Sequence, residues 1–350
     1  MRELFDDYGV HALADGQFGS TGKGVLAAWL AEKAVAQGVN FNMCVSNAGP
    51  NSGHTFYDMD GNKHVLKQLP TFAVASYLLG TIVPVYLSAG AIIDPEILWN
   101  ECARYPGLPV YVNNNAAIIT AEDKASEHSG TVAAVAGTRS GTGAALARKV
   151  LRDPNAVFRS IKAPRPDNLH PSDGFDTAIA INDVYHGRVF MEISQGFSLG
   201  LNSAEFYPKV TSRECTVMQG LADARLPARA LTRSYLSMRT YPIRVGNVDG
   251  YSSGDYYPDQ EETSWEELGQ TPELTTVTQR VRRVFTFSRQ QAEDAIFAND
   301  PDFVFLNFMN YLNENGQSSI LGLFDQLSDM SSRGFEVIQG YGPRSSDVEF

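Results

Sequence analysis

The segment that most constrains the fold is a glycine-rich stretch, residues 16–24, between an apolar segment and a helix-like one. It reads Gly-Gln-Phe-Gly-Ser-Thr-Gly-Lys-Gly, with four glycines, two hydroxyl side chains and one lysine. Residues 9–13 before it are mainly apolar, and residues 25–33 after it have the composition of a helix. This order predicts a strand, a loop and a helix. Since backbone N–H groups at such a helix start attract anions and Lys23 adds a charge, we expect a phosphate-binding loop. Its spacing is not that of the common P-loop.

A second glycine turn, residues 49–55, reads Gly-Pro-Asn-Ser-Gly-His-Thr and follows a predicted strand at 41–46. His54 therefore lies near the end of a strand, where it could act as an acid or an electrostatic partner for a phosphate. The alternative is a histidine that serves only packing and local hydrogen bonds.

The remaining pattern alternates short apolar segments with helices. Strands are predicted at 64–69, 91–93, 109–112, 189–193 and 303–306. Asp94 can cap, and Pro95 can open, a helix that runs to about Arg104. We expect an α/β fold with a central, mostly parallel sheet flanked by helices, formed by one domain over residues 1–350. Residues 162–175, rich in proline and charge, are predicted to be an exposed connection.

Composition excludes several classes of protein. The 350 residues hold 28 lysines and arginines against 40 acidic residues, a net charge of −12, so we expect no nucleic acid polymer as partner. Three cysteines without paired spacing suit a reducing cytoplasm. The acidic start of the chain does not have the pattern of a signal peptide, and prolines and glycines interrupt the uncharged run 68–93, so no membrane association is expected.

These two glycine segments resemble a known family. Residues 16–24 resemble the signature loop of adenylosuccinate synthetase, Gly-x-Gln-Trp-Gly-Asp-Glu-Gly-Lys-Gly, and residues 51–55 resemble its Asn-Ala-Gly-His-Thr. The similarity continues in order through residues 137–138, 148–152, 192–196, 207–212, 244–246, 277–283 and 342–343. Because it spans nearly the whole chain, the resemblance implies the fold of that family and a C–N bond-forming ligase.

The family moves the γ-phosphoryl group of a nucleoside triphosphate to O6 of a purine monophosphate, and the amine of L-aspartate then displaces it. The resemblance implies catalytic roles for Ser20, Lys23, His54 and Gln195. It implies monophosphate binding by Ser20, Asn51, Thr138, Arg152, Gln195, Thr211 and Val245, with Arg152 supplied by the second subunit of a homodimer. For the triphosphate it implies Gly19, Ser20, Thr21, Gly22, Lys23, Gly24, Gly53, His54, Thr55, Arg282, Asn307, Asn310, Gly342 and Pro343. It implies an aspartate site at Thr278, Arg280 and Arg282, and a Mg²⁺ ion on the Gly53 carbonyl, with Ser20 as a second candidate ligand. The alternative for the arginines is an ordinary solvated face.

Two departures from the family pattern bear on the substrates. Ser20 stands where the family has the aspartate that accepts the purine N1 proton, and a hydroxyl cannot do this near neutral pH without help. The guanine-reading segment Thr-Lys-Leu-Asp of the family appears as Asn-Phe-Met-Asn, residues 307–310. Because an amide both donates and accepts, Asn310 suits adenine, which predicts ATP or dATP as donor.

These changes, with the short chain, are similar to a bacteriophage branch of the family that uses dGMP in place of IMP. The resemblance then implies dGMP, L-aspartate and ATP as substrates, N6-succino-2-amino-2′-deoxyadenylate as product, and the host cytoplasm as location if a phage encodes the chain. Two alternatives stay open: an enzyme that acts on IMP, and a nucleotide-binding regulator without catalysis. Product analysis with each nucleotide would separate them.

Overall fold

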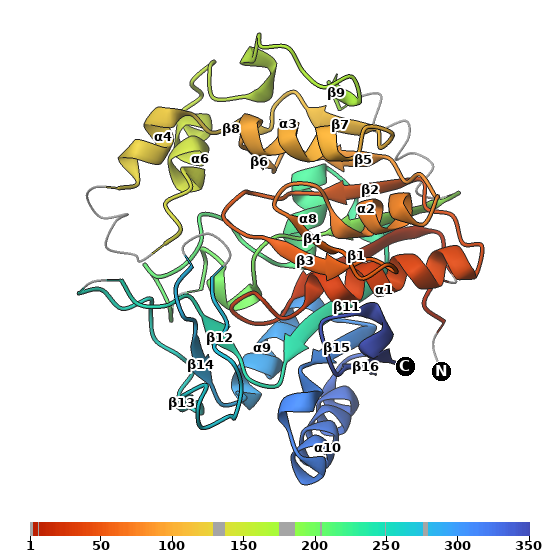
Figure 1. Cartoon of the computed structure of the whole chain (residues 1–350), viewed down its shortest axis with the longest axis vertical. Coiled ribbons are helices and arrows are strands. Elements are labelled where there is room, and N and C mark those ends of the chain that lie inside the picture. The colour runs from red at the N-terminus through yellow and green to blue at the C-terminus, as the bar shows by residue number, and fades with distance from the viewer. Residues whose placement is uncertain are drawn as a thin grey trace.

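The central element is a ten-stranded sheet, shown in Figure 1, with the order β17-β16-β15-β11-β1-β10-β2-β5-β7-β9. The computed structural model describes residues 3–5, 7–128, 137–174, 186–203, 205–248, 250–275 and 279–350. Neighbouring strands are parallel, except β16 with β17. The strands are β1 Gly9–Asp15, β2 Met43–Ser46, β5 Val85–Leu87, β7 Val110–Asn113, β9 Leu169–Ser172, β10 Arg188–Glu192, β11 Leu231–Arg239, β15 Phe303–Asn307, β16 Glu336–Gly340 and β17 Val348–Glu349. The predicted α/β class with a mostly parallel sheet is confirmed.

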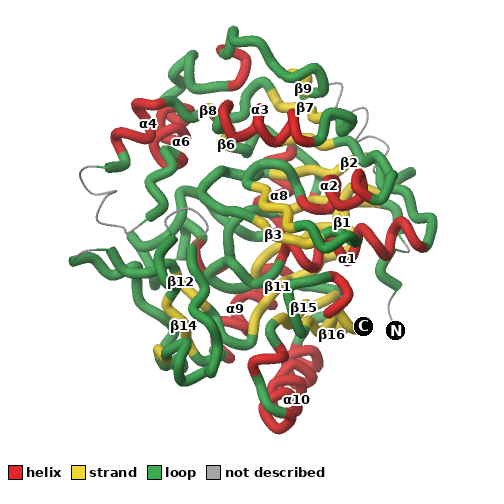
Figure 2. The backbone as a smooth tube through the Cα atoms, viewed as in Figure 1, coloured by secondary structure: helices red, strands yellow, loops and turns green. Residues whose placement is uncertain are grey.

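Both faces of the sheet are covered by helices, so its central strands are apolar at successive positions. In β15, Phe303 and Phe305 face one core while Val304 and Leu306 face the other. The first core includes α1 Lys23–Ala36, α2 Thr71–Leu78 and α3 Pro95–Arg104, and the second includes α8 Val217–Ala224, α9 Arg289–Asn299 and α10 Glu314–Met330. Figure 2 shows these helices on the two sides of the strands.

The predicted start of α3 is confirmed in detail. Asp94 is the N-cap, and its carboxylate accepts the N–H groups of Glu96 at 3.2 Å and Ile97 at 3.5 Å, with Pro95 in the first turn. The exposed connection predicted at 162–175 is wrong in part, because β9 pairs in parallel with β7. The proline and charged residues of that segment do not resemble a strand, but β9 lies at the edge of the sheet, where proline is tolerated.

Smaller elements surround the sheet. β3 His54–Tyr57 and β4 Lys63–Leu66 form a hairpin, β6 Ile92–Ile93 pairs with β8 Ala117–Ile118, and β14 Arg283–Phe285 lies between β12 Ile243–Arg244 and β13 Glu262–Thr263. Among the described residues, the other helices are α4 Ala121–Ser126 and α6 Thr142–Val150, with 3₁₀ turns at Phe158–Ser160, Phe197–Leu199, Ala228–Ala230, Met309–Tyr311 and Ser345–Asp347. Cys44, Cys102 and Cys215 are buried and free. Over the described ranges, no helix has both the length and the apolar character needed to cross a bilayer.

Candidate active site

The largest cavity near the predicted motifs, about 820 Å³, lies where adjacent parallel strands end. The strands β15, β11, β1, β10 and β2 are neighbours in the sheet. Segments that follow β1, β2, β10 and β15 line the cavity. Open α/β sheets bind ligands at this carboxyl edge. The topology therefore brings the two glycine segments, which are separate in sequence, to one site.

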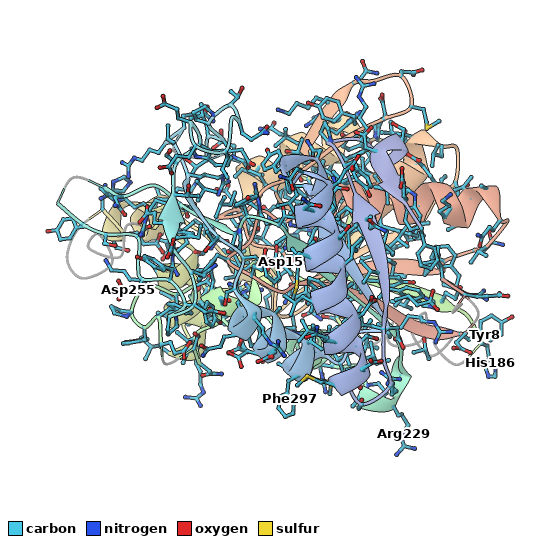
Figure 3. All side chains as sticks on the ribbon, turned by 90° about the horizontal axis from the view of Figure 1, so that it is seen from below. Tyr8, Asp15, His186, Arg229, Asp255 and Phe297 are labelled. Carbon is cyan, nitrogen blue, oxygen red and sulfur yellow. The ribbon has the colours of Figure 1, made fainter. Side chains whose placement is uncertain are left out.

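The predicted phosphate loop is held from inside by Asp15, the last residue of β1. Figure 3 labels Asp15 in the interior of the molecule, and the residue has no exposed surface. Its carboxylate accepts the hydroxyl of Thr21 at 2.6 Å and the ammonium of Lys23 at 3.2 Å. The Lys23 ammonium also donates to the Gln195 carbonyl at 2.8 Å. The loop is thus fixed in shape by internal polar contacts.

Two loop residues have left-handed backbone conformations. Gly22, the N-cap of α1, has φ 95°, and a Cβ there would lie 2.0 Å from the Asn307 amide nitrogen, so only glycine fits. Ser20 has φ 57°, which is uncommon for a residue with a side chain. Ser20 is exposed and lines the cavity. This conformation therefore occurs at a residue of the cavity wall.

His54 lines the cavity at the start of β3 and is supported by a buried carboxylate. Its Nδ1 lies 3.5 Å from Oε2 of Glu192, which is 2% exposed. The other oxygen of Glu192 accepts the Phe72 N–H at 2.6 Å, which fixes the carboxylate. The buried Nε2 of His54 has no hydrogen-bond partner among the described residues. A ligand oxygen would satisfy it, so the geometry favours the functional interpretation of His54 over ordinary core packing.

On the purine side predicted by the resemblance, two candidates already contact each other. The Gln195 side-chain amide donates to the Asn51 side-chain oxygen at 2.8 Å. Thr138, Thr211 and Val245 also line the cavity. Candidates that lie far apart in the sequence therefore line the same cavity.

Arg239, the last residue of β11, connects three parts of the site although it is completely buried. Its guanidinium donates to the Ser20 carbonyl at 3.1 Å and to both carboxylate oxygens of Glu273 at 2.6 and 3.2 Å. It also lies 3.9 Å from the centre of the Phe308 ring. Arg282 lies nearby, and burial lowers its pKa to about 10, so it remains cationic at neutral pH.

Not all predicted residues reach the cavity. Of the described candidates, Arg152, Arg280 and Asn310 are not among its lining residues, and Arg152 and Asn310 are exposed. Thr278 lies outside the described residues. The others line the cavity: Gly19, Ser20, Thr21, Gly22, Lys23, Gly24, Asn51, Gly53, His54, Thr55, Thr138, Gln195, Thr211, Val245, Arg282, Asn307, Gly342 and Pro343. The Asn307 amide bonds the Thr21 carbonyl at 3.3 Å and the Phe308 N–H at 2.8 Å, so this side chain braces the loop.

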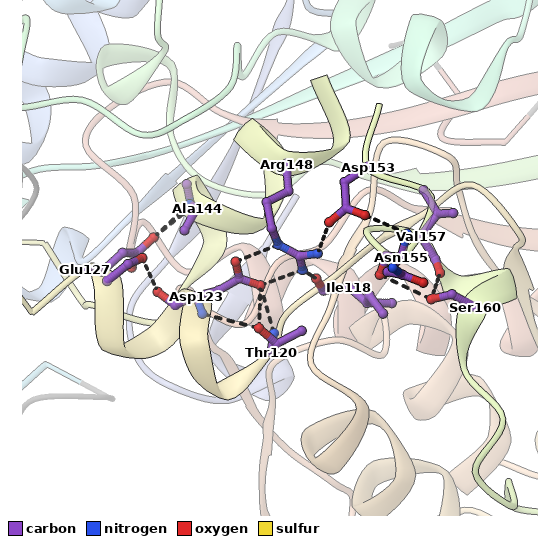
Figure 4. Close-up of polar contacts among 12 residues, drawn as sticks. Ile118, Thr120, Asp123, Glu127, Ala144, Arg148, Asp153, Asn155, Val157 and Ser160 are labelled. Atoms are coloured by element: carbon purple, nitrogen blue, oxygen red, sulfur yellow. Dashed lines mark hydrogen bonds and ion pairs between the residues drawn. The ribbon is translucent and has the colours of Figure 1, made fainter. Parts of the chain in front are cut away.

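The segment before Arg152 is anchored by ion pairs, drawn in Figure 4. Arg148 of α6 donates to Asp123 of α4 at 2.7 and 2.8 Å and to Asp153 at 3.0 Å. Glu127 accepts the Gly143 N–H at 2.8 Å at the start of α6. These contacts fix the end of α6, from which Arg152 projects outward.

Four residues of the site were given no role by the sequence: Asp15, Arg239 and Glu273, and also Glu192, although it lies in a segment that resembles the family. Asp15, Glu192 and Arg239 each end a parallel strand, and a polar residue there is a usable signal, because these strands are otherwise apolar. Glu273 can be recognised as part of the site only from its contact with Arg239, 34 residues earlier in the chain.

A phosphate-type loop, a carboxylate-supported histidine and an arginine cluster around one cavity define an α/β enzyme that activates a phosphorylated substrate. The family model described as "Adenylosuccinate synthetase" matches residues 13–170. The chain is 36% identical to the N6-succino-2-amino-2′-deoxyadenylate synthase of Vibrio phage phiVC8, covering 97% of each chain. It is 37% identical to the synthase of that name from Cyanophage S-2L, covering 96% of this chain and 91% of the relative.

Solved structures agree. The Cyanophage S-2L succinoaminodeoxyadenylate synthetase (PurZ), solved with dGMP and dATP as energy donor, superposes with a TM-score of 0.86 at 34% identity, covering 98% of this chain and 95% of the other. Adenylosuccinate synthetase from Plasmodium falciparum has the same fold, with a TM-score of 0.76 at 15% identity, covering 97% and 99%. The chain belongs to the adenylosuccinate synthetase family. It is a ligase of the kind that forms a C–N bond, as the sequence predicted.

Proposed function

We propose that this enzyme joins L-aspartate to C6 of dGMP with ATP or dATP as phosphoryl donor. The guanine O6 attacks the γ-phosphorus, the N1 proton leaves and the nucleoside diphosphate departs. The aspartate amine then attacks C6 and phosphate leaves, which gives N6-succino-2-amino-2′-deoxyadenylate. The observation that carries the proposal is the single cavity that gathers Lys23, His54, Gln195 and Arg282, in a chain at least 34% identical to four phage synthases of that name.

The residues of the cavity suit the steps of this reaction. Lys23 and the N–H groups at the start of α1 supply positive charge for the phosphates. His54 can offer its unpaired Nε2 to the transferred phosphoryl group, while the Glu192 carboxylate lies 3.5 Å from Nδ1. Arg282 can pair with a carboxylate of aspartate. With Ser20 in place of the family's aspartate, the N1 proton passes to another group, such as water.

Magnesium fits this site only together with phosphates. Over the described ranges, no cluster of three or more His, Cys, Asp or Glu side chains could hold a metal ion. Mg²⁺ in phosphoryl-transfer sites usually has few protein ligands and takes the rest from water and substrate phosphates. Gly53 and Ser20 both line the cavity, and a backbone carbonyl and a hydroxyl are suitable neutral ligands. A bound Mg²⁺ would neutralise charge on the donor phosphates.

The surface around Arg152 supports the proposed homodimer. Arg152 is exposed, and the two residues before it, Val150 and Leu151, are 67% and 79% exposed although apolar. A second copy would cover them and bring its arginine to the cavity. Mixing the inactive variants Arg152→Ala and Lys23→Met should then restore about a quarter of the activity, because half of the dimers would be mixed and each would have one intact site. No recovery after exchange of subunits would exclude a shared site.

The decisive experiment measures diphosphate and phosphate release with dGMP, GMP, IMP and dIMP, with and without L-aspartate. We expect the highest kcat/KM with dGMP, a requirement for aspartate, and a product whose mass is that of the succinylated deoxynucleotide. Faster turnover of IMP would make the chain an adenylosuccinate synthetase, and no release with any purine would support a regulator. The phage relatives also favour the host cytoplasm as the place of action.

A further inference from the structure

The carboxylate of Asp15 is the centre of the phosphate loop. It accepts four hydrogen bonds, from the N–H groups of Gln17 at 2.9 Å and Gly19 at 3.2 Å, the hydroxyl of Thr21 at 2.6 Å and the ammonium of Lys23 at 3.2 Å. No other acidic residue occurs between positions 9 and 24. The shape of the loop and the charge balance of Lys23 therefore depend on this one side chain.

The contacts of Lys23 give this carboxylate a role in ligand binding. The ammonium is 5% exposed and has three N–H donors, of which one contacts Asp15 and one the Gln195 carbonyl. One N–H remains for a ligand. Without Asp15 the buried ammonium would lose its counter-charge and its direction, and burial of an unpaired charge is unfavourable.

The position of this carboxylate is unusual against the family pattern. When Gln17 and the Gly-Lys-Gly ending are aligned with that pattern, Asp15 falls on its first glycine and Thr21 on its glutamate. Thr21 is also the residue whose hydroxyl bonds Asp15, at 2.6 Å. Along the loop, two carboxylates have thus been lost, at positions 20 and 21, and one has been gained at position 15, where its side chain contacts that of position 21.

We propose that Asp15 is the positioning residue for Lys23 and that it replaces a carboxylate carried at position 21 by the family loop. This inference rests on the proposed function only for the identity of the ligand, a nucleoside triphosphate. It predicts that Asp15 and Thr21 are exchangeable as a pair but not singly. With Asp15→Gly alone, Lys23 has no counter-charge; with Thr21→Glu alone, two carboxylates crowd one ammonium.

The test compares Asp15→Gly, Thr21→Glu and the double variant, with binding of a fluorescent N-methylanthraniloyl ATP as the readout, because binding does not require turnover. We expect each single variant to bind about tenfold more weakly or worse, and the double variant to recover to within about threefold of the natural chain. Asp302→Asn is the matched control. It removes another buried carboxylate, which accepts the Ser234 N–H at 2.9 Å at the start of β15, and it should lower stability without changing binding of the probe.

A double variant that binds as weakly as the product of the two single effects would overturn the exchange. If Asp15→Gly does not fold, Asp15→Asn tests the positioning role instead. Asparagine keeps the size of the side chain, but its amide N–H points toward the ammonium or the Thr21 hydroxyl. Normal binding by Asp15→Asn would overturn the positioning role. An inactive natural chain that still binds the probe would refute the proposed reaction alone, since these comparisons would stand.

Discussion

The phosphate loop, residues 16–24, and the described part of the predicted aspartate-binding arm, residues 273–275 and 279–283, are supported in different ways. The first is tied to a carboxylate with no exposed surface and to a lysine that is 5% exposed. The second is tied by ion pairs with partly exposed carboxylates: Glu273, 26% exposed, pairs with the buried Arg239, and Glu262, 40% exposed, pairs with Arg283. Polar contacts in a dry interior are strong and costly to leave unpaired, whereas half-exposed ones compete with water. The phosphate loop is therefore held in shape without a ligand, whereas the ion pairs of the arm are the weaker of the two kinds of support.

The largest expected effect comes from the ammonium of the phosphate loop. Lys23→Met should lower kcat/KM about 10³-fold, as expected for the loss of a preorganised charge in a catalytic site. Lys33→Met is the control, since Lys33 is on the same helix but lies over the Trp29 ring at the surface. Steady-state diphosphate release measures both, and equal kinetics for the two variants would contradict the role of Lys23.

Removing one partner of the Arg239–Glu273 ion pair should destabilise the protein by an amount that depends on which partner is removed. Glu273→Gln leaves a fully buried guanidinium without a counter-ion and should cost about 3 kcal/mol of unfolding free energy, whereas Arg239→Met leaves a carboxylate that can reach water and should cost less. Both should raise KM for L-aspartate more than KM for dGMP. Urea unfolding and kinetics test this; a rise in both KM values to the same extent would mean that the pair supports the whole site.

The strand beneath the phosphate loop contains a pH-sensitive group that is separate from the chemistry. Burial lowers the pKa of His11 from 6.5 to about 4. Between these values the unfolded chain binds the additional proton, so stability falls as the pH decreases from 6.5 toward 4. From pH 7 to pH 5 the His11 contribution should be a loss of about 2 kcal/mol. Urea midpoints at the two pH values should differ less in His11→Phe, and an unchanged difference would assign the pH effect to other groups.

A substitution at Ser20 tests whether the phosphate loop also selects the purine base of the substrate. If the small side chain makes room for the 2-amino group of guanine, Ser20→Asp should shift the ratio of kcat/KM for dGMP over IMP about tenfold toward IMP. Equal losses for both nucleotides would remove Ser20 from substrate selection. Ser52→Asp, at another residue of the cavity wall, controls for added negative charge.

The smallest effect is expected at Asn310, which is exposed and absent from the cavity lining. The sequence pattern predicts that Asn310→Asp moves the donor preference toward GTP, because a carboxylate accepts from guanine N1–H and its amino group. Its surface position limits the expected change to about threefold. An unchanged ratio of ATP to GTP use would leave donor selection to residues that line the cavity.

The sequence predicted those elements whose causes lie within a few neighbouring residues. Strand, loop and helix around residues 16–24, and the capped start of α3, were predictable because their causes lie within a few residues. The edge strand β9 was missed, since a short edge strand needs little hydrophobic pattern. Most predicted site residues line one cavity, but their assignment came from the resemblance of ordered motifs rather than from physical reasoning alone.

The sequence by itself determined the α/β class, the phosphate-type loop and the family, because these depend on apolar periodicity and on glycines at fixed spacing. Only the tertiary structure decided that Asp15 supports Lys23, that Glu192 supports His54 and that Arg239 bonds both Ser20 and Glu273. The physical reason is that parallel strands place their carboxyl ends together regardless of separation along the chain, so residues more than a hundred positions apart become neighbours. The sequence can show that a polar residue ends an apolar strand, but it does not show which residue is its partner.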